Sequence, residues 1–500
     1  MQATLAYGHR SSVTTSLDEA ALDFAANLAR APVSFKGRAT NPYLLRQMLF
    51  ALHRVVIGDF RWMDEAEWAW VLDPVITVHP DQLFFEAFST DESCYARLSC
   101  PLHAFEAEGP VSYGTTNIDF TFGLRSALEG MRTSQRTMFG VGAEGFAVET
   151  AGDGSQTHFE RKVDIPEGWL RGFLQVQSAL TMHPFMFEVR PTDLLAIIAF
   201  FEDNKPPGPP HGLRYELKPD EPIRVVLEPW EKEFILRDTH YKGYERTVRV
   251  WGRRRLQLLQ HVLPYAHKVT IAVLGRGLPH FYFCTCGEHQ FLLGLSGWTA
   301  NDWSKGSSFE LLAPQDRPEP QVVERIHARL SEDLFGVRTQ LAAEDDIPRA
   351  QVEHALFELC RAGRVMFDPT TGFYRLRELF AEPLDTEALF PTASRLRKAQ
   401  ELLDAEAVEL EHIAAPETPE NWRRETKATG TVEDAGQYSI TVAVDTEGRL
   451  RFGTCECPFF QANIMSRGPC EHILAGRLAL DRHLKQTEQP DTIVGEELEN

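Results

Sequence analysis

Three cysteines and one histidine near the end of the chain have the types and the spacing of a metal site. Cys455 and Cys457 are separated by one residue, and after a loop of twelve residues Cys470 and His472 repeat that spacing. Thiolate sulfur and imidazole nitrogen are donors that zinc prefers, and four of them complete a tetrahedral shell. Because no position remains for a water molecule, we expect one structural Zn²⁺ ion and no catalytic one.

The residues around the four donors predict the elements that hold them. Residues 439–444 and 450–452 alternate between apolar and polar types, and the turn-forming residues 445–448 join them, which is typical of a β-hairpin. Residues 473–480 have the spacing of a helix. Two donors therefore follow a strand and two begin a helix, where the positive end of the helix dipole stabilises the thiolate of Cys470.

This arrangement resembles the SWIM zinc finger family, in which C-x-C and C-x-H pairs flank a variable loop between a β-hairpin and a helix. The resemblance covers roughly residues 422–483 and includes Tyr438 and the run from 469 to 475. Family members bind nucleic acid or proteins, so the resemblance implies zinc and leaves the partner open. The ligands that it implies are Cys455, Cys457, Cys470 and His472.

The chain upstream of the finger is similar to a group of bacterial SWIM-containing proteins. The similarity lies in residues 114–120, 169–180 and 295–298. Such proteins occur beside MoxR-type AAA+ ATPases and von Willebrand A-type (vWA) proteins. The resemblance therefore implies a component of a multiprotein assembly, with a protein of one of these two kinds as a partner.

The composition is that of a globular protein and limits its partners. The 500 residues are 43% hydrophobic and 25% charged, which excludes disordered and fibrous classes. Fifty-one basic against 72 acidic side chains leave a net charge of −21, and such a surface repels phosphate backbones. We find no apolar run of about 20 residues and no secretory signal, so we expect a cytoplasmic protein that does not enter a membrane.

Proline-rich and polar stretches at 205–210 and 314–320 predict boundaries in a multidomain α+β protein. Apolar spacing predicts helices at 17–28, 43–56 and 253–263, and strands within 82–100, 137–149, 247–251, 269–274 and 281–286. The predicted parts are an N-terminal α+β domain (1–204), a second α+β domain (212–313), a winged-helix-like segment (321–380), a ββα SWIM zinc-finger domain (392–485) and an acidic tail (486–500).

Residues 321–380 have the pattern of three helices followed by a β-hairpin, which resembles a winged helix. Winged helices often enter the major groove of DNA. This segment, however, carries eight arginines against ten acidic residues and therefore lacks the attraction to phosphate on which such binding depends. We favour a role in packing or protein docking over DNA reading.

A second group of metal-ligating residue types is Cys284, Cys286 and His289. On a strand, the two cysteines lie on the same face, which is also how core residues are arranged. Three donors are too few for a closed zinc site, and nothing in the sequence places His280 as a fourth. We favour ordinary packing over a second metal site or a redox-active pair.

Residues 237–268 form a basic island of eight basic and two acidic side chains, with Tyr241, Tyr244 and Trp251 among them. Such a mixture could follow a phosphate backbone and stack on bases. The alternative is that Arg253–Arg255 form the solvated face of a helix or contact an acidic neighbour. We favour that alternative.

No nucleotide-binding or hydrolase motif occurs in the chain, and Asp119 and His158 have no visible partners. We therefore expect a non-catalytic zinc-binding SWIM-finger protein that acts as a protein-interaction adaptor, with a hydrolase as the third hypothesis. The second is a nucleic-acid-binding component that uses the island around Arg253–Arg255 and the finger residues Arg423, Arg424, Lys427, Arg449 and Arg451.

Overall fold

The computed structural model divides the chain into two compact units. Unit 1 comprises residues 1–307 and 318–389, and unit 2 comprises residues 308–317 and 390–500. The structure describes residues 5–7, 12–15, 19–26, 33–57, 74–118, 136–142, 159–161, 167–205, 212–275, 278–297, 303, 309–312, 318–379, 393–414, 425–445, 449–465 and 467–488. Both helices and sheets are present, in agreement with the predicted α+β class.

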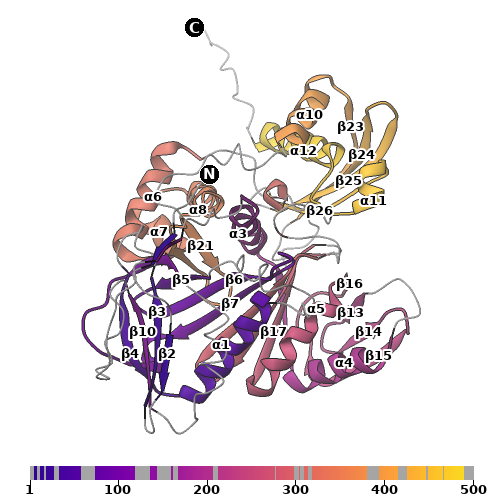
Figure 1. Ribbon diagram of the computed structural model, residues 1–500. Coiled ribbons are helices and arrows are strands. Elements are labelled where there is room, and N and C mark those ends of the chain that lie inside the picture. Colours follow the sequence, from indigo (N-terminus) through magenta and orange to yellow (C-terminus); the bar gives the residue numbers. More distant parts are fainter. Residues whose placement is uncertain are drawn as a thin grey trace. The chain divides into compact units, whose positions relative to one another are not determined.

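The core of unit 1 is an eight-stranded antiparallel sheet in the order β12-β17-β18-β19-β7-β6-β5-β9 (Figure 1). The strands are β5 (Val75–Val78), β6 (Gln82–Phe88), β7 (Cys94–Pro101), β9 (Gly114–Asn117), β12 (Phe185–Val189), β17 (Lys268–Val273), β18 (His280–Cys286) and β19 (His289–Leu295).

This sheet joins strands from both sides of the proline-rich stretch at 205–210. Strand β12, which precedes it, pairs with β17, which follows it. Strand β7 likewise pairs with β19, with Leu98 opposite Phe291. The regions predicted as the first and second α+β domains therefore share one hydrogen-bonded sheet. Such pairing over nearly 200 residues leaves no local signal in the sequence.

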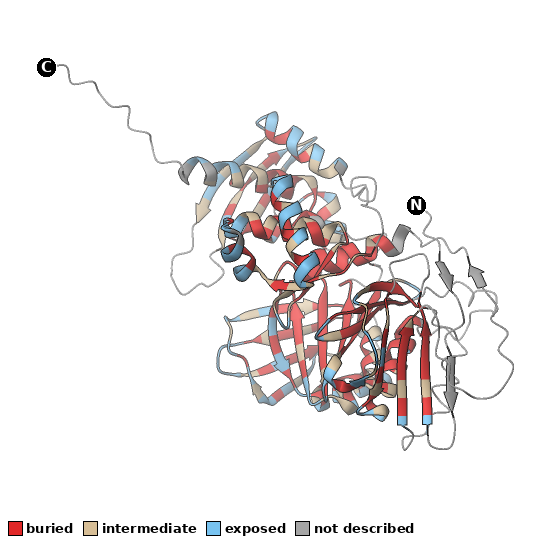
Figure 2. Ribbon diagram, turned by 90° about the vertical axis from the view of Figure 1, so that its left-hand side faces the viewer, coloured by how far each residue is buried: buried red, intermediate tan, exposed pale blue. Residues whose placement is uncertain are grey.

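Both faces of the central strands are buried, since nearly every residue of β6 and β7 is buried. Figure 2 shows buried residues along many strands of the protein. Helix α1 (Pro42–Ile57) packs on one face, in a cluster with Leu83 and Phe85. On the opposite face, the ring of Phe173 from helix α3 (Glu167–Leu180) lies 4.9 Å from that of Phe88. Neighbouring side chains of a strand point to opposite faces of the sheet. Because helices pack on both faces, most side chains of these strands are apolar.

The other described strands of residues 1–307 form three smaller sheets. They have the orders β2-β3-β10-β4-β8, β15-β14-β13-β16 and β1-β11. Their strands are β1 (Leu5–Tyr7), β2 (Ser12–Thr15), β3 (Glu19–Ala25), β4 (Phe35–Ala39), β8 (Phe105–Ala107), β10 (Arg136–Gly142), β11 (Phe159–Arg161), β13 (Leu213–Leu217), β14 (Pro222–Leu227), β15 (Lys232–His240) and β16 (Arg246–Val250).

The helix predicted at residues 17–28 is wrong, because residues 19–25 form strand β3. This strand pairs with β10, with Leu22 opposite Phe139, and its Phe24 ring lies 5.4 Å from the Phe139 ring. Alanine and leucine favour a helix in isolation, but pairing with two strands and burial of Leu22 and Phe24 on one face outweigh that weak preference.

The predicted helix at 253–263 is shorter than expected. Helix α5 spans only Arg253–Leu256. The described helix before it is α4 (Pro191–Asp203). Two 3₁₀ turns follow, at Gln257–His261 and Leu263–Tyr265. Pro264 has no backbone N–H with which to continue a helix.

Residues 318–379 contain the predicted helices and hairpin. The elements are α6 (Pro320–Asp333), β20 (Phe335–Val337), α7 (Arg338–Asp345), α8 (Arg349–Arg361), β21 (Val365–Asp368) and β22 (Phe373–Leu376), with the three strands ordered β20-β22-β21. Helix α8 is followed by Gly363 with φ +72°, a conformation that glycine adopts without strain. Classification as a winged helix stays a prediction.

The β21-β22 hairpin is tied to the eight-stranded sheet and to α3. Gln177 of α3 accepts a hydrogen bond from the backbone N–H of Phe367 at 2.8 Å. Three ion pairs join charged side chains of the hairpin to β6, β7 and the turn before β6. They are Arg377–Glu86 at 2.8 Å, Arg375–Asp81 at 2.8 Å and Asp368–Arg97 at 3.2 Å.

Unit 2 is a four-stranded antiparallel sheet with helices on one face (Figure 1). Helix α12 contacts all four strands, and α10 packs on α12. Arg477 of α12 also donates to the carbonyl of Leu311 in a 3₁₀ turn. The elements are β23 (Val408–Ala414), β24 (Thr426–Glu433), β25 (Gln437–Val444), β26 (Leu450–Cys455), α10 (Ala393–Asp404), α11 (Pro458–Asn463) and α12 (Glu471–Glu488).

Several sequence predictions fall wholly or mostly outside the described residues. These are the linkers at 205–210 and 314–320, the tail at 486–500, Asp119, His158, Arg423 and Arg424. None of the described helices combines the length and the apolar character needed to cross a bilayer.

Candidate metal centre

The four predicted ligands lie where strand β26 passes into α11 and where α12 begins. Cys455 is the last residue of β26, and Cys457 precedes α11, where its sulfur accepts a hydrogen bond from the N–H of Phe460 at 3.4 Å. Cys470 immediately precedes α12, and His472 is the second residue of that helix. The predicted hairpin and helix therefore bring the two pairs together.

The donor atoms of Cys455, Cys457, Cys470 and His472 all lie within 4.8 Å of one another. All four side chains are buried, with the greatest exposure, 3%, at Cys455 and His472. Three sulfurs and one imidazole nitrogen are a common donor set for zinc. These side chains are positioned to bind one metal ion, and the set is consistent with Zn²⁺.

Hydrogen bonds within the cluster favour the thiolate form of Cys455 and Cys457. A hydrogen bond with Cys470 lowers the pKa of Cys455 to about 4 and that of Cys457 to about 6. Cys470 retains its proton, because these same hydrogen bonds raise its pKa. Burial opposes the charged form of His472, but hydrogen bonds to Cys455 and Cys457 raise its pKa to about 9. A divalent cation can take the place of these protons.

The orientation of His472 assigns different roles to its two ring nitrogens. Nδ1 faces the sulfurs, 3.7 Å from Sγ of Cys455, whereas Nε2 lies 3.2 Å from Oδ2 of Asp434. Lys398 of α10 lies 3.2 Å from the other oxygen of Asp434. A metal-binding histidine commonly donates its second N–H to a carboxylate, which fixes the ring and its tautomer. Nδ1 is therefore the donor available to a metal.

Helix α10 also holds the loop between the two ligand pairs. Arg395 donates to the carbonyl of Arg467 at 3.0 Å and to that of Pro469, just before Cys470, at 2.7 Å. Its guanidinium lies over the ring of Phe459, 5.1 Å from the centroid. Sequence reasoning missed Arg395, Lys398 and Asp434, since they stand outside the C-x-C and C-x-H pairs and carry no spacing signal of their own.

Residues 440–475 match the SWIM zinc finger family model. The match contains all four ligands and agrees with the resemblance inferred from the sequence. The match begins at residue 440 and therefore does not include the supporting residues Asp434, Lys398 and Arg395, which come earlier in the chain. No curated protein matches the chain.

Among solved structures, the chain is similar to the proliferating cellular nuclear antigen from Entamoeba histolytica. The two are 11% identical, and the match covers 53% of this chain and 98% of that one, with a TM-score of 0.35. Such a low score does not establish a common fold.

Cys284, Cys286 and His289 do not form a metal cluster in the described part of the chain. Both thiols point into the core, and burial raises the pKa of Cys286 to about 12 and also raises that of Cys284. A buried protonated thiol is a poor nucleophile and a poor ligand. The structure therefore agrees with ordinary packing.

Several charges of the basic island are neutralised by acidic side chains within unit 1. The pairs are Arg255–Asp91 at 2.8 Å, Arg249–Glu228 at 2.6 Å and Lys268–Glu188 at 2.7 Å. Arg254 is exposed, and the side chain of Arg253 lies outside the described residues.

The basic residues of the finger are partly neutralised too. Arg449 is buried and pairs with Asp445 at 3.2 Å, and Arg451 lies 3.9 Å from Glu425. Lys427 is exposed on β24. Among the described basic residues that the sequence analysis named in the finger, Lys427 alone is exposed.

Proposed function

We propose that this protein is a non-catalytic zinc-binding adaptor that joins protein partners in a multiprotein assembly. In this proposal the SWIM zinc finger is a folded recognition unit whose shape depends on a structural Zn²⁺ ion. The larger unit carries further protein-binding surface.

The arrangement of the metal centre supports a structural and non-catalytic role. Catalytic zinc keeps one position for water or substrate, whereas four protein donors fill a tetrahedral ion. The four donors here are buried, and Asp434 contacts the ring nitrogen of His472 that faces away from the sulfurs. A substrate would have to displace one of these ligands to reach the metal.

The ion pairs of the hairpin arginines are the observation that favours protein partners over nucleic acid. Arg375 and Arg377 are at most 1% exposed and form ion pairs with Asp81 and Glu86. If residues 321–380 are a winged helix, the strands of its hairpin pack inward and these cations do not reach a phosphate. The overall charge of −21 opposes nucleic acid as well.

The resemblance to bacterial SWIM-containing proteins indicates which partners to test first. A MoxR-type AAA+ ATPase and a vWA-type protein from the same host are the two proposed classes. The exposed Phe452, which is 48% accessible on β26, gives the finger an apolar contact residue. Aromatic side chains of this kind often dominate the binding energy of protein interfaces.

The experiment compares purified protein partners with nucleic acids as the salt concentration changes. Full-length protein is titrated with each candidate partner, and separately with 30-nucleotide single-stranded DNA, duplex DNA and RNA. We expect at least one protein partner to bind at physiological salt, with an affinity that changes less than about tenfold between 100 and 400 mM salt. Cys470→Ser should abolish that binding, and Cys284→Ala should preserve it.

The nucleic-acid hypothesis gives the opposite pattern. Several phosphate contacts would make the affinity fall by roughly a thousandfold or more over a fourfold rise in salt. Saturable binding of DNA or RNA at physiological salt with that slope, together with no binding of either protein class, would overturn the proposal.

A further inference from the structure

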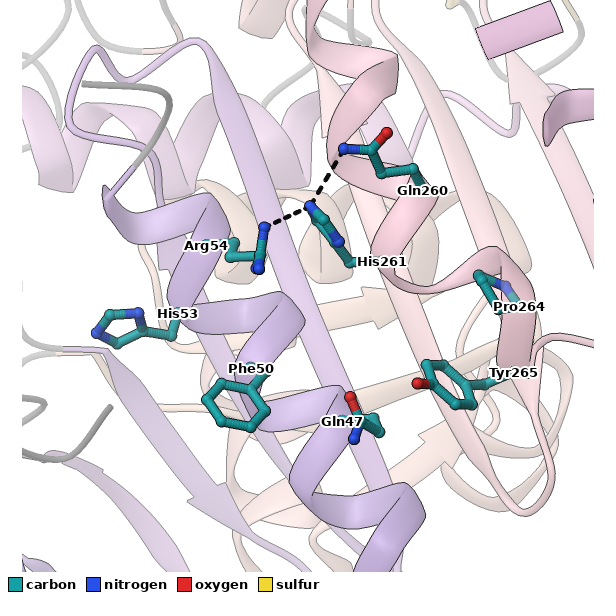
Figure 3. A pocket seen from close by; sticks show the side chains of 8 residues that line it. All are labelled: Gln47, Phe50, His53, Arg54, Gln260, His261, Pro264 and Tyr265. Carbon is teal, nitrogen blue, oxygen red and sulfur yellow. Dashed lines mark hydrogen bonds between the residues drawn. The ribbon is translucent and has the colours of Figure 1, made fainter. Parts of the chain in front are cut away.

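A cavity of about 380 Å³ lies in unit 1 between helix α1 and the two 3₁₀ turns that precede β17. Figure 3 shows Gln47, Phe50 and Arg54 on the α1 side and His261 and Tyr265 on the other. The volume is within the range of roughly 300–1,000 Å³ that small-molecule sites occupy. The cavity is independent of the metal centre and of the proposed protein partners.

Arg54 gives this cavity a positive charge, and no acid among the described residues forms an ion pair with it. The residues that line the cavity include no aspartate or glutamate. In the part of the chain that the structure describes, Arg54 forms no ion pair, and its hydrogen-bond partner is His261. The chain has a net charge of −21, and three cations of the nearby basic island, Arg249, Arg255 and Lys268, are paired with acids. Arg54 makes the cavity attractive to an anion.

His261 fixes the guanidinium without removing its charge. Nη1 of Arg54 lies 2.7 Å from Nε2 of His261, and the side-chain amide of Gln260 lies 3.3 Å from the same nitrogen. Because arginine and the amide NH₂ group are donors, Nε2 accepts and the ring proton resides on Nδ1. A neutral imidazole therefore orients Arg54. Figure 3 marks the two hydrogen bonds to His261 as dashed lines.

Aromatic rings provide the apolar part of the cavity. Phe50 and Tyr265 belong to its lining. The hydroxyl of Tyr265 lies 3.2 Å from that of Tyr43, and this hydrogen bond raises the pKa of Tyr265 to about 12, so the ring stays neutral at physiological pH. Flat apolar surfaces of this kind favour contact with the ring of a ligand.

We propose that this cavity binds a small aromatic carboxylate, with its carboxylate on Arg54 and its ring against Phe50 and Tyr265. A guanidinium matches one carboxylate in charge and in fork geometry. A phosphate of charge near −2 requires more donors. The guanidinium of Arg46 lies within 6.0 Å of the centroids of Tyr43 and Phe50, where it is engaged with those rings.

The test titrates the full-length protein with 2-naphthoate and with its neutral isostere 2-naphthamide by calorimetry. We expect saturable one-to-one binding of the carboxylate, at least about tenfold tighter than that of the amide. Arg54→Gln should weaken carboxylate binding by at least about tenfold and change amide binding by less than about threefold. Arg254→Gln, at an exposed arginine of α5 that does not line the cavity, is the matched control and should leave both affinities unchanged.

Thermal unfolding of each variant first establishes that it is folded, and Arg54→Lys provides a second variant. Lysine keeps the charge but loses the two-pronged contact, so its affinity for the carboxylate should lie between those of the wild type and Arg54→Gln. Equal affinities for the carboxylate and the amide, or no saturable carboxylate binding at low millimolar concentration, would overturn the proposal. Competition by inorganic phosphate at equal concentration would overturn the assignment to carboxylates.

Discussion

The ring nitrogen Nε2 of His472 lies 3.2 Å from a carboxylate oxygen of Asp434, on the side of the imidazole opposite the three sulfurs. This contact joins the metal centre to the turn between β24 and β25. Through the same carboxylate it reaches Lys398 of α10. The supporting structure of the finger therefore begins more than forty residues before the stretch that matches the SWIM zinc finger.

Asp434→Asn should weaken zinc binding by roughly 10- to 100-fold, since loss of a charged partner behind a ligating histidine has effects of that size. The measurement is competition with a chromogenic chelator at fixed pH. Asp404→Asn is the matched control, because Asp404 is an exposed acid of α10 that contacts Arg482 and lies outside the centre. An Asp434→Asn affinity equal to that of the wild type would show that this contact does not position the ring.

Arg395→Gln should release the loop between the two ligand pairs while the metal remains bound. The loss removes hydrogen bonds to the carbonyls of Arg467 and Pro469. We expect faster trypsin cleavage after Arg467 in the zinc-loaded variant, measured by mass spectrometry, with unchanged zinc content. Arg482→Gln serves as a control on an exposed arginine of α12. Equal cleavage rates would contradict the anchoring role.

Unit 1 should lose stability as the pH falls from about 6.5 to 4. Burial lowers the pKa of His79 to about 4, that of His280 to about 3 and that of His289 to about 4. Below pH 6.5 these histidines bind protons in the unfolded chain but stay neutral in the folded chain. The stability that they contribute is therefore fully present above pH 6.5 and declines as the pH falls through this window. Each histidine contributes a slope of up to about 1.4 kcal/mol per pH unit.

Urea unfolding at pH 7.5 and 5.5, followed by tryptophan fluorescence, measures this slope. Eight of the nine tryptophans lie within residues 1–307, so the signal reports on unit 1. His280→Phe keeps an aromatic ring and removes one titrating group, and should reduce the stability difference between the two pH values by about 1.4 kcal/mol. An identical pH dependence in wild type and variant would mean that His280 is not held neutral.

Breaking the buried pair Glu86–Arg377 from one side should destabilise unit 1 by about 3–5 kcal/mol. Both side chains are 0% exposed, and Glu86 also accepts a hydrogen bond from Tyr95 at 2.6 Å. Glu86→Gln keeps an acceptor for Tyr95 but leaves Arg377 charged and buried. Adding Arg377→Met should recover most of the loss, since it removes the unpaired charge. Additive losses in the double-mutant cycle would show that the two residues do not act as a pair.

The ligands were predictable from the sequence because their recognition is local. Cys455, Cys457, Cys470 and His472 are within eighteen residues, and the hairpin and helix around them have clear apolar spacing. Asp434, Lys398 and Arg395 contact the centre through the sheet and α10. An acid in a turn and two basic residues on a helix look like ordinary solvated side chains until the fold brings them to the centre.

The architecture of unit 1 was less predictable because it depends on distant partners. Glu86 and Arg97 look like solvent-facing positions of alternating strands, yet they meet Arg377 and Asp368 about 270 to 290 residues later in the chain. Residues 19–25 illustrate the same limit. Their composition favours a helix, and only pairing with β2 and β10 makes them a strand.

The most direct test of the zinc centre is elemental analysis of reduced full-length protein together with limited proteolysis. We predict one zinc per chain in the wild type and in Cys284→Ala. Cys470→Ser should lose the metal, and residues 393–488 should become protease-sensitive while unit 1 stays resistant. Wild-type protein that contains no metal and still resists protease throughout residues 393–488 would contradict the account.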